Sequence, residues 1–183
     1  MACQNVADIE LDDSYFERFS DTQPVLLHPY DPAVEDLVRR YVCDLREIVG
    51  PEPEIEHRGA TALHMCGKGE IDLYVRVDRA EFQAAYRRLQ AALGEPGSLE
   101  PHRARFNDEI DGVEVEVQLV DREHPEERAG RACFHYLQAH PGAVEAYAAV
   151  KRTYAPISRR AYYRAKYHFM RAILAQAEKA DEG

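Results

Sequence analysis

The sequence has too few basic residues to balance its acidic ones. Its 23 Lys and Arg stand against 33 Asp and Glu, which gives a net charge of −10. Because a protein that holds a nucleic-acid backbone needs a basic face, we expect no nucleic-acid partner. The chain also lacks an apolar run of membrane length and a basic, apolar leader at its start. We therefore expect a cytoplasmic protein with no membrane partner.

Motifs built on cysteine or on a catalytic serine are also missing. The four cysteines, Cys3, Cys43, Cys66 and Cys133, are scattered, and none belongs to a C-x-x-C pair. We expect them to be reduced thiols. His64 and Cys66 are spaced like half of a zinc site, but zinc takes four ligands and the sequence shows no second pair. No nucleophile motif of a hydrolase is present.

The apolar pattern predicts one domain built on a sheet. We expect a polar arm at residues 1–22 and a single domain at residues 23–179. Asp78 and Glu81 have the spacing of a capping box for one of its helices. A mixed β-sheet flanked by helices, with a helical C-terminal half, follows, so the fold class is α/β or α+β. The expected order is strand 25–30, helix 31–49, strand 71–77, helix 82–93, strands 102–107 and 113–120, and three helical pieces from Pro125, broken near Pro141 and Pro156.

Two acidic residues mark the start of the strand 71–77, within the stretch EHRGATALHMCGKGEIDLYVRV. Glu70 and Asp72 are two positions apart, so both side chains point to one face. In the later strand VEVEVQLV the valines share one face, and Glu114, Glu116 and Gln118 share the other. That pattern is typical of a half-exposed strand with an acidic side. If this strand lies beside the strand 71–77, Glu116 faces Asp72 across the sheet.

Carboxylates crowded in this way repel one another, and a cation between them makes the arrangement tolerable. Magnesium, or manganese in its place, prefers carboxylate oxygens and keeps coordination positions open for phosphate. The preceding turn Gly59-Ala60-Thr61 has free backbone amides that can cradle phosphate. These features predict a site for phosphoryl or nucleotidyl transfer whose metal ligands are Glu70, Asp72 and Glu116.

The chain resembles the GrpB family, also called UPF0157, a branch of the nucleotidyltransferase superfamily. The resemblance runs from about Val25 to about Ala177. A family pattern of His-x-Gly-Ser-Thr-Ala-Val-Pro-Gly followed by Lys-Pro-x-Ile-Asp corresponds here to HRGATALHM and KGEID. The stretch YLQAHP matches a family Tyr-Leu-Arg-x-His-Pro, and later matches are Tyr147 with Lys151, and Tyr162 with Lys166 and Phe169.

The departures from the family pattern change its polar residues. Ala60 replaces a serine, and Glu116 and Gln118 replace a His-x-His pair. The residues CFH at 133–135 stand where the family has Phe-Arg-Asp. Acids at Glu70 and Glu116 make the set resemble the three carboxylates of other nucleotidyltransferases more closely. We therefore expect a related but specialised pocket.

The resemblance implies a nucleotidyltransferase-like fold and an enzyme that uses ATP or another nucleoside triphosphate with magnesium. Such an enzyme transfers a nucleotidyl group to a small-molecule acceptor, or forms an adenylate that activates a carboxylate. Glu116 then binds metal or takes the proton of the acceptor. The alternative is a non-catalytic module of the same fold that binds a nucleotide or another small molecule, because the serine is missing. The acceptor, the base preference and the oligomeric state, a homo-oligomer included, stay open.

Several further residues have two interpretations. Lys68 or Arg105 neutralises phosphate charge in the enzyme hypothesis. Arg103 and Arg105 hold the triphosphate, or they pair with the acidic side of the neighbouring strand. Lys166 contacts the nucleotide, or it is exposed on a helix that buries its tyrosines. His57 orients the turn by hydrogen bonding, or it takes part in proton chemistry.

Overall fold

The computed structural model describes residues 12–181, in which a sheet with helices is followed by a run of three helices. The three helical pieces predicted from Pro125 are confirmed. None of the helices within these residues is long and apolar enough to cross a membrane. The elements are α1 (Asp13–Glu17), α2 (Val34–Val49), β1 (Glu54–Arg58), α3 (Gly59–Ala62), β2 (Ile71–Val77), α4 (Phe82–Leu93), β3 (Ser98–Glu100), β4 (Arg103–Ile110), β5 (Val113–Asp121), α5 (Pro125–Ala139), α6 (Pro141–Tyr154) and α7 (Arg159–Asp181).

The described part of the chain forms a five-stranded mixed sheet in the order β1-β2-β5-β4-β3. The neighbours β2 and β5 are parallel, and the other neighbours are antiparallel. A tight turn at Asp111 and Gly112 joins β4 to β5, and both residues have a positive φ, 50° and 82°, as a two-residue hairpin turn requires. The mixed sheet with flanking helices confirms the predicted α+β class.

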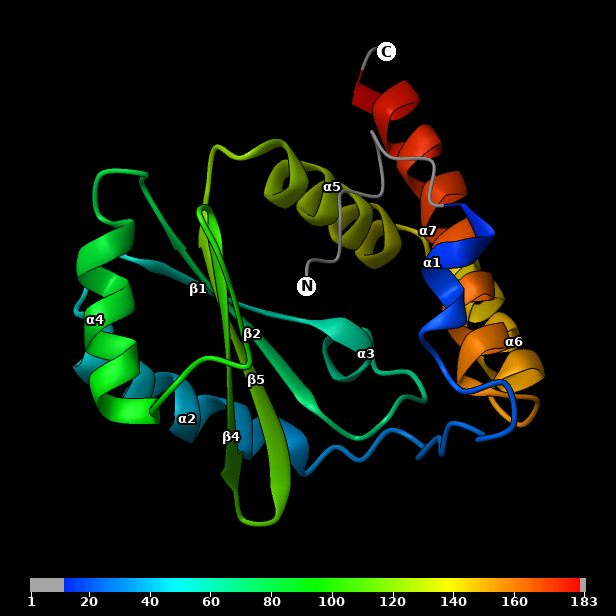
Figure 1. Cartoon of the computed structure of the whole chain (residues 1–183), viewed down its shortest axis with the longest axis horizontal. Helices are drawn as coiled ribbons and strands as arrows, with labels where there is room; N and C mark the ends of the chain where they lie inside the picture. The colour runs from blue at the N-terminus through cyan, green and yellow to red at the C-terminus, as the bar shows by residue number, and fades with distance from the viewer. Residues whose placement is uncertain (1–11, 182–183) are drawn as a thin grey trace.

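One face of the sheet carries the larger core. Figure 1 shows α2 and α4 together on this side of the strands. The apolar side chains that alternate along β2 and β5 are buried against these helices: Ile71, Leu73, Val75, Val77, Val115, Val117 and Leu119. The alternation predicted for VEVEVQLV is therefore confirmed. Asp72 and Glu116, which lie between these residues, face the other side of the sheet.

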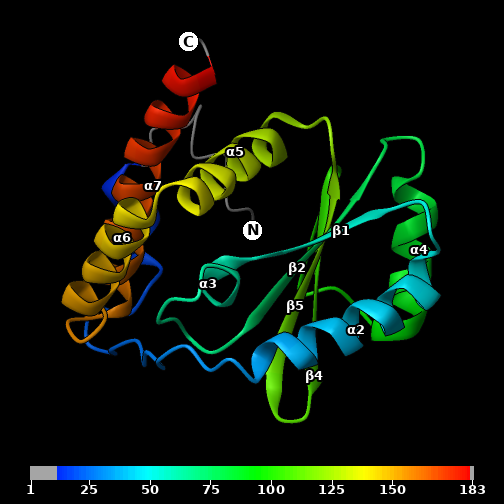
Figure 2. The same ribbon diagram turned by 180° about the vertical axis from the view of Figure 1, so that it is seen from behind.

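The other face of the sheet looks toward α5, α6 and α7. Figure 2 shows these helices together across from the strands, with the short α3 between the sheet and α6. They enclose a second apolar cluster made of Met65, Cys133, Leu137, Tyr147, Ala148, Ile173 and Leu174. The C-terminal helices consequently cover part of this face, where the side chains of Glu70 and Glu116 are 21% and 27% exposed.

The predicted polar arm lies only partly within the described residues, because residues 1–11 are outside them. In the part that is described, α1 lies along α7 (Figure 1). Phe16 is fully buried, and the ring of Phe19 stacks on that of Tyr163 with centroids 4.3 Å apart. Residues 12–19 therefore pack against the domain, and the domain boundary after residue 22 stays a prediction.

Two local predictions are wrong. Residues 25–30 form no strand beyond one bridge between His28 and Gly67. The chain beside them is the irregular loop before β2, which offers no row of partners for a ladder. The capping box is also absent from α4, which has no side-chain cap. The carboxylate of Asp78 pairs instead with Nε of Arg122, at 3.1 Å.

Candidate active site

The turn after β1 lies directly against the carboxylate of Asp72. Gly59 opens α3 with a φ of +80°. A Cβ at this position would lie 1.9 Å from Oδ2 of Asp72. Only glycine permits both the backbone angle and this close approach. The close contact with Asp72 therefore explains why residue 59 is a glycine. A contact between its backbone and phosphate stays a prediction.

His57 holds the turn through a chain of hydrogen bonds. Its Nε2 lies 2.9 Å from Oγ1 of Thr61, and that hydroxyl donates to the backbone oxygen of Glu70 at 3.2 Å. Because Thr61 gives its proton to Glu70, His57 must donate to Thr61 through Nε2–H. Burial and the nearby His64 lower the pKa of His57 to about 4, so the ring is neutral at pH 7. This geometry supports the first role predicted for His57, orienting the turn.

The structure brings the three predicted metal ligands together on the polar face of the sheet. Asp72 on β2 and Glu116 on β5 are register partners, and neighbouring strands run about 4.8 Å apart. Glu70 immediately precedes β2. Burial, Glu70 and Glu116 together raise the pKa of Asp72 to about 7, although Lys166 and Lys68 act in the opposite direction. The charges of the carboxylates are therefore incompletely balanced at Asp72.

Both arginines of β4 are engaged by carboxylates. Nη1 of Arg105 lies 3.6 Å from Oε2 of Glu116, and Nη2 of Arg103 lies 3.3 Å from Oε1 of Glu100. The amide of Gln118 donates to Oε1 of Glu116 at 2.5 Å. Among the described residues, Nε of Arg105 and Oε1 of Gln118 are buried without a hydrogen-bond partner. Polar groups beside Glu116 thus retain unused bonding capacity.

Three lysines, Lys68, Lys151 and Lys166, bring positive charge near Asp72. Nζ of Lys68 lies 2.6 Å from Oε2 of Glu70. Lys151 on α6 is 5% exposed, and its Nζ lies 4.7 Å above the ring centroid of Tyr147. Burial and the charge of Lys166 lower the pKa of Lys151 to about 8. Lys166 on α7 forms a hydrogen bond with Tyr147. The acidic strands therefore face a cationic pair carried by two helices.

Lys151 belongs to the candidate site, and the sequence predictions omit it. Its signal was present in the pattern of α6, whose buried residues are Tyr147, Ala148 and Lys151. A lysine on the apolar face of a helix is rarely buried unless a partner holds it. That unusual position, together with the match of Tyr147 and Lys151 to the family pattern, was the available clue.

A cavity of about 310 Å³ lies between the polar face of the sheet and the C-terminal helices. Four residues predicted for the site stand outside its lining: His57, Thr61, Arg105 and Glu116. The lining includes the predicted Gly59, Ala60, Lys68, Glu70, Asp72, Arg103 and Lys166, and it adds Tyr74, Tyr147, Lys151 and Tyr162. The cavity wall thus joins two of the acids to all three lysines.

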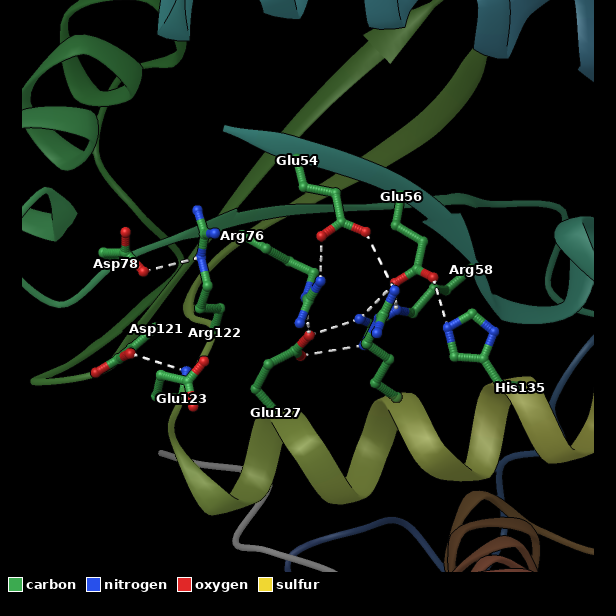
Figure 3. A network of polar contacts seen from close by, with 11 residues as sticks. Glu54, Glu56, Arg58, Arg76, Asp78, Asp121, Arg122, Glu123, Glu127 and His135 are labelled. Carbon is green, nitrogen blue, oxygen red and sulfur yellow. Dashed lines mark hydrogen bonds and ion pairs between the residues drawn. The ribbon is translucent and has the colours of Figure 1, made fainter. Parts of the chain in front are cut away.

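A buried ionic network ties the sheet to α5 beside this cavity (Figure 3). Arg58 donates to both oxygens of Glu127, at 3.1 and 2.5 Å, and Nε of Arg76 donates to the same carboxylate at 2.7 Å. All three side chains are buried. Glu56 accepts a bond of 2.7 Å from Nε of Arg58 and lies 3.0 Å from Nε2 of His135. The network therefore links β1, β2 and α5.

The network also holds the start of the turn at Gly59, because Arg58 immediately precedes that residue. The sequence predictions missed it. Its signal is the alternation of Glu54, Glu56 and Arg58 along β1, with Arg76 opposite Glu54 in β2. The partner that completes it, Glu127, comes from a helix whose docking the sequence does not reveal.

A family model described as GrpB protein matches residues 24–176. The chain belongs to the GrpB family. The match confirms the resemblance seen in the stretch from His57 to Asp72 and in the C-terminal helices. None of the curated proteins compared with the chain is significantly similar to it.

Two solved polymerases resemble this GrpB-family chain in structure. The Cid1 poly(U) polymerase superposes with a TM-score of 0.46 and 12% identity, over 76% of this chain and 46% of the polymerase. Polymerase beta from Leishmania infantum gives a TM-score of 0.39 and 12% identity, over 82% of this chain and 55% of the polymerase. The chain spans about half the length of these polymerases.

Proposed function

We propose that this GrpB-family protein is a magnesium-dependent nucleotidyltransferase that acts on a small-molecule acceptor. Its nucleotide is ATP or another nucleoside triphosphate. The observation that carries the proposal is that Glu70 and Asp72 line one cavity with the lysines of α6 and α7, while Glu116 is the register partner of Asp72. A metal-bound triphosphate needs both parts, carboxylates for the ion and cations for the phosphates.

The donor set fits magnesium. All three candidate ligands offer carboxylate oxygens, which this ion prefers. The raised pKa of Asp72 shows that its charge lacks full compensation, and a divalent cation would supply it. Lys68 holds Glu70 and Arg105 lies near Glu116, so both cations can move to phosphate oxygens when an ion takes the carboxylates. Bound there, magnesium would lower the charge on the phosphates and polarise the attacked one.

The lysines of the C-terminal helices suit the triphosphate. Lys151 and Lys166 line the same cavity as Asp72, and the charge of Lys166 helps burial to lower the pKa of Lys151. A polyanion between them removes that repulsion and restores full protonation of Lys151. Tyr147 holds Lys166 by a hydrogen bond and lies beneath Lys151, so both ammonium groups are positioned before the ligand arrives.

The remaining step is attack by the acceptor. Glu116 takes the proton from the acceptor hydroxyl or amine as the acceptor forms a bond to the α-phosphorus. The bond from the α-phosphorus to the bridging oxygen breaks, and pyrophosphate leaves beside Lys151 and Lys166. Gln118 keeps the Glu116 carboxylate in place. His57, which is neutral and bonded to Thr61, orients the turn and transfers no proton.

A non-catalytic nucleotide-binding module is the second candidate. Two observations favour it: Ala60 stands in place of the family's serine, and Glu116 is already occupied by Gln118 and Arg105. In such a module the acids and lysines bind a nucleotide with its metal but break no bond. The two candidates differ in one product, pyrophosphate.

The test measures binding and turnover in the same preparations. Calorimetry follows ATP binding with and without magnesium, and a coupled assay follows pyrophosphate release with a panel of small alcohols, amines and carboxylates. Asp72→Asn should abolish both signals, because it removes the central ligand. The control Glu109→Gln, which changes an exposed acid of β4, should alter neither. Binding without pyrophosphate would favour the module, and equal binding by Asp72→Asn would refute both candidates.

A further inference from the structure

A second group of metal-ligating side chains lies beside the same cavity, whose lining includes two of its members, His102 and Glu126. His102 is in the turn before β4, His124 precedes α5 and Glu126 is in the first turn of α5. One ring nitrogen of each histidine and one carboxylate oxygen of Glu126 all lie within 4.8 Å of one another. The two imidazole rings stack with centroids 3.5 Å apart and planes 10° from parallel.

Two carboxylates converge on the same nitrogen of this group. Nε2 of His102 lies 3.1 Å from Oε2 of Glu126 and 3.7 Å from Oε2 of Glu100. The side chains of His102, Glu126 and Glu100 are only 17%, 18% and 19% exposed. Arg103 holds the other oxygen of Glu100 at 3.3 Å, which leaves Oε2 directed at the histidine. The cluster is therefore partly enclosed, unlike a chance group of surface acids.

The backbone holds the two histidines near each other. The amide of Asp121 donates to the carbonyl of His102 at 2.9 Å, and the amide of His124 donates to the carbonyl of Asp121 at 3.1 Å. The amide of Glu126 donates to Nδ1 of His124 at 3.3 Å, so this nitrogen carries no proton. One residue at the end of β5 thus joins both turns. The lone pair of His124 Nδ1 is used by the amide of Glu126, so an ion binds His124 either by replacing this long hydrogen bond or by displacing the proton on Nε2.

We infer that His102, His124 and Glu126 form a binding site for a divalent transition-metal ion of the zinc type, with Glu100 as the nearest fourth ligand. Imidazole nitrogen and carboxylate oxygen together suit zinc, whereas magnesium prefers an all-oxygen set. The fourth position of a zinc site can also be filled by water.

Binding requires a small rearrangement of the rings. The lone pairs of stacked, parallel imidazoles run side by side, whereas an ion about 2.1 Å from each nitrogen needs them to converge. The rings must therefore splay, and the ion replaces the contact between His102 and Glu126. The same ion joins the turn before β4 to the start of α5, the helix that carries Glu127 of the ionic network. Its role is structural, in stabilising that junction.

This site is separate from the carboxylates at Asp72. Glu116 is the register partner of Asp72, whereas Val120, four residues further along β5, is paired with Arg103 beside His102. At about 3.3 Å per residue the two places lie on the order of 13 Å apart along the strand. Zinc binding here is consequently independent of the proposed magnesium site.

The test titrates zinc and cobalt into the full chain, freed of affinity tags and stripped of metal by a chelator. We expect one zinc ion per chain, cobalt absorption bands typical of a four-coordinate site, and a rise in melting temperature. The double variant His102→Gln/His124→Gln should weaken zinc binding more than about 100-fold, since loss of a supporting residue alone costs up to that factor. The control His168→Gln, an exposed histidine of α7, and Asp72→Asn should both bind zinc normally.

Two outcomes would overturn the inference: equal zinc affinity in the parent and the double variant, or a parent affinity no tighter than millimolar. Should the double variant fail to fold, histidine side-chain NMR of the parent decides. Zinc must then shift the resonances of His102 and His124. Shifts confined to other histidines would rule the site out.

Discussion

Asp72 is the residue at which the steric and electrostatic features of the site meet. The backbone of Gly59 lies against its carboxylate, and Glu116 is its partner across the sheet. Its raised pKa, about 7 in place of 3.8, means that ionising it in the folded protein costs free energy when no cation is bound. A side chain kept under this cost is typical of a functional site.

The free-energy cost of ionising Asp72 predicts an unusual dependence of protein stability on pH. Between pH 4 and 7 the folded protein holds the Asp72 proton more tightly than the unfolded chain does, so Asp72 makes stability fall as the pH rises through that window. Asp72→Asn removes this loss. In metal-free buffer at pH 8 we expect the variant to be more stable than the parent, by about 4 kcal/mol at most, and the difference to shrink toward pH 4. Urea unfolding at several pH values measures it.

Magnesium provides the internal control for that experiment. If the ion binds Asp72, millimolar magnesium should raise the stability of the parent at pH 8 and leave Asp72→Asn unchanged. A variant that is less stable than the parent at every pH would show that the Asp72 carboxylate supports the fold.

Spacing alone placed the acids of the site, but it could not place the cations. Glu70 and Asp72 stand two apart at the start of a strand, and alternation set Glu116 on the polar face of β5, so a neighbouring pair of strands was enough to bring them together. The pattern of α6 signals that Lys151 is buried, but what the lysine faces depends on how α6 docks, which no local pattern encodes. The sequence also left open whether Arg105 holds phosphate or pairs with an acid of the neighbouring strand, because its pairing with Glu116 depends on side-chain geometry.

At the level of elements, α5 is joined to the sheet by buried ion pairs. Glu127 receives hydrogen bonds from both Arg58 and Arg76, and all three are buried. Removing the charge of Glu127 would leave two arginines buried without their common partner. The network stabilises the junction only as long as it is complete.

Glu127→Gln should therefore destabilise the protein by about 3–5 kcal/mol, the usual effect of removing one partner of a buried ion pair. Glu123→Gln is the matched control, because Glu123 pairs with Arg128 at 3.8 Å and both side chains are 71% exposed. Surface pairs of this kind contribute little, so its unfolding curve should follow that of the parent. Comparable losses in the two variants would mean that the network does not hold α5 in place.

The elements themselves followed from the sequence where apolar alternation or helical spacing was strong. The strands 71–77 and 113–120 and the three C-terminal helices are confirmed. Residues 25–30 have the composition of a strand, but a strand needs a neighbour, and theirs is the loop containing Gly67. Asp78 has the type and spacing of a cap, but Arg122 takes its carboxylate. In both cases a contact distant in sequence decided the outcome.

In the whole molecule, the site is formed between two halves of the chain. The acids come from the sheet, built of residues 54–121, and the lysines Lys151 and Lys166 come from the C-terminal helices. Neither half alone offers both the carboxylates and the lysines of the proposed site. A family resemblance could indicate that both halves matter, but only the packed structure shows Lys151 and Lys166 opposite Asp72.

The most direct measurement is a crystal structure of the protein with magnesium and a non-hydrolysable ATP analogue. The account predicts one or two ions bound by oxygens of Asp72, Glu70 and Glu116, and phosphate oxygens in contact with Lys151 and Lys166. Glu109→Gln crystals should show the same density, and Asp72→Asn crystals should show none. A nucleotide bound away from the polar face of the sheet, or phosphates that touch neither lysine, would contradict the account.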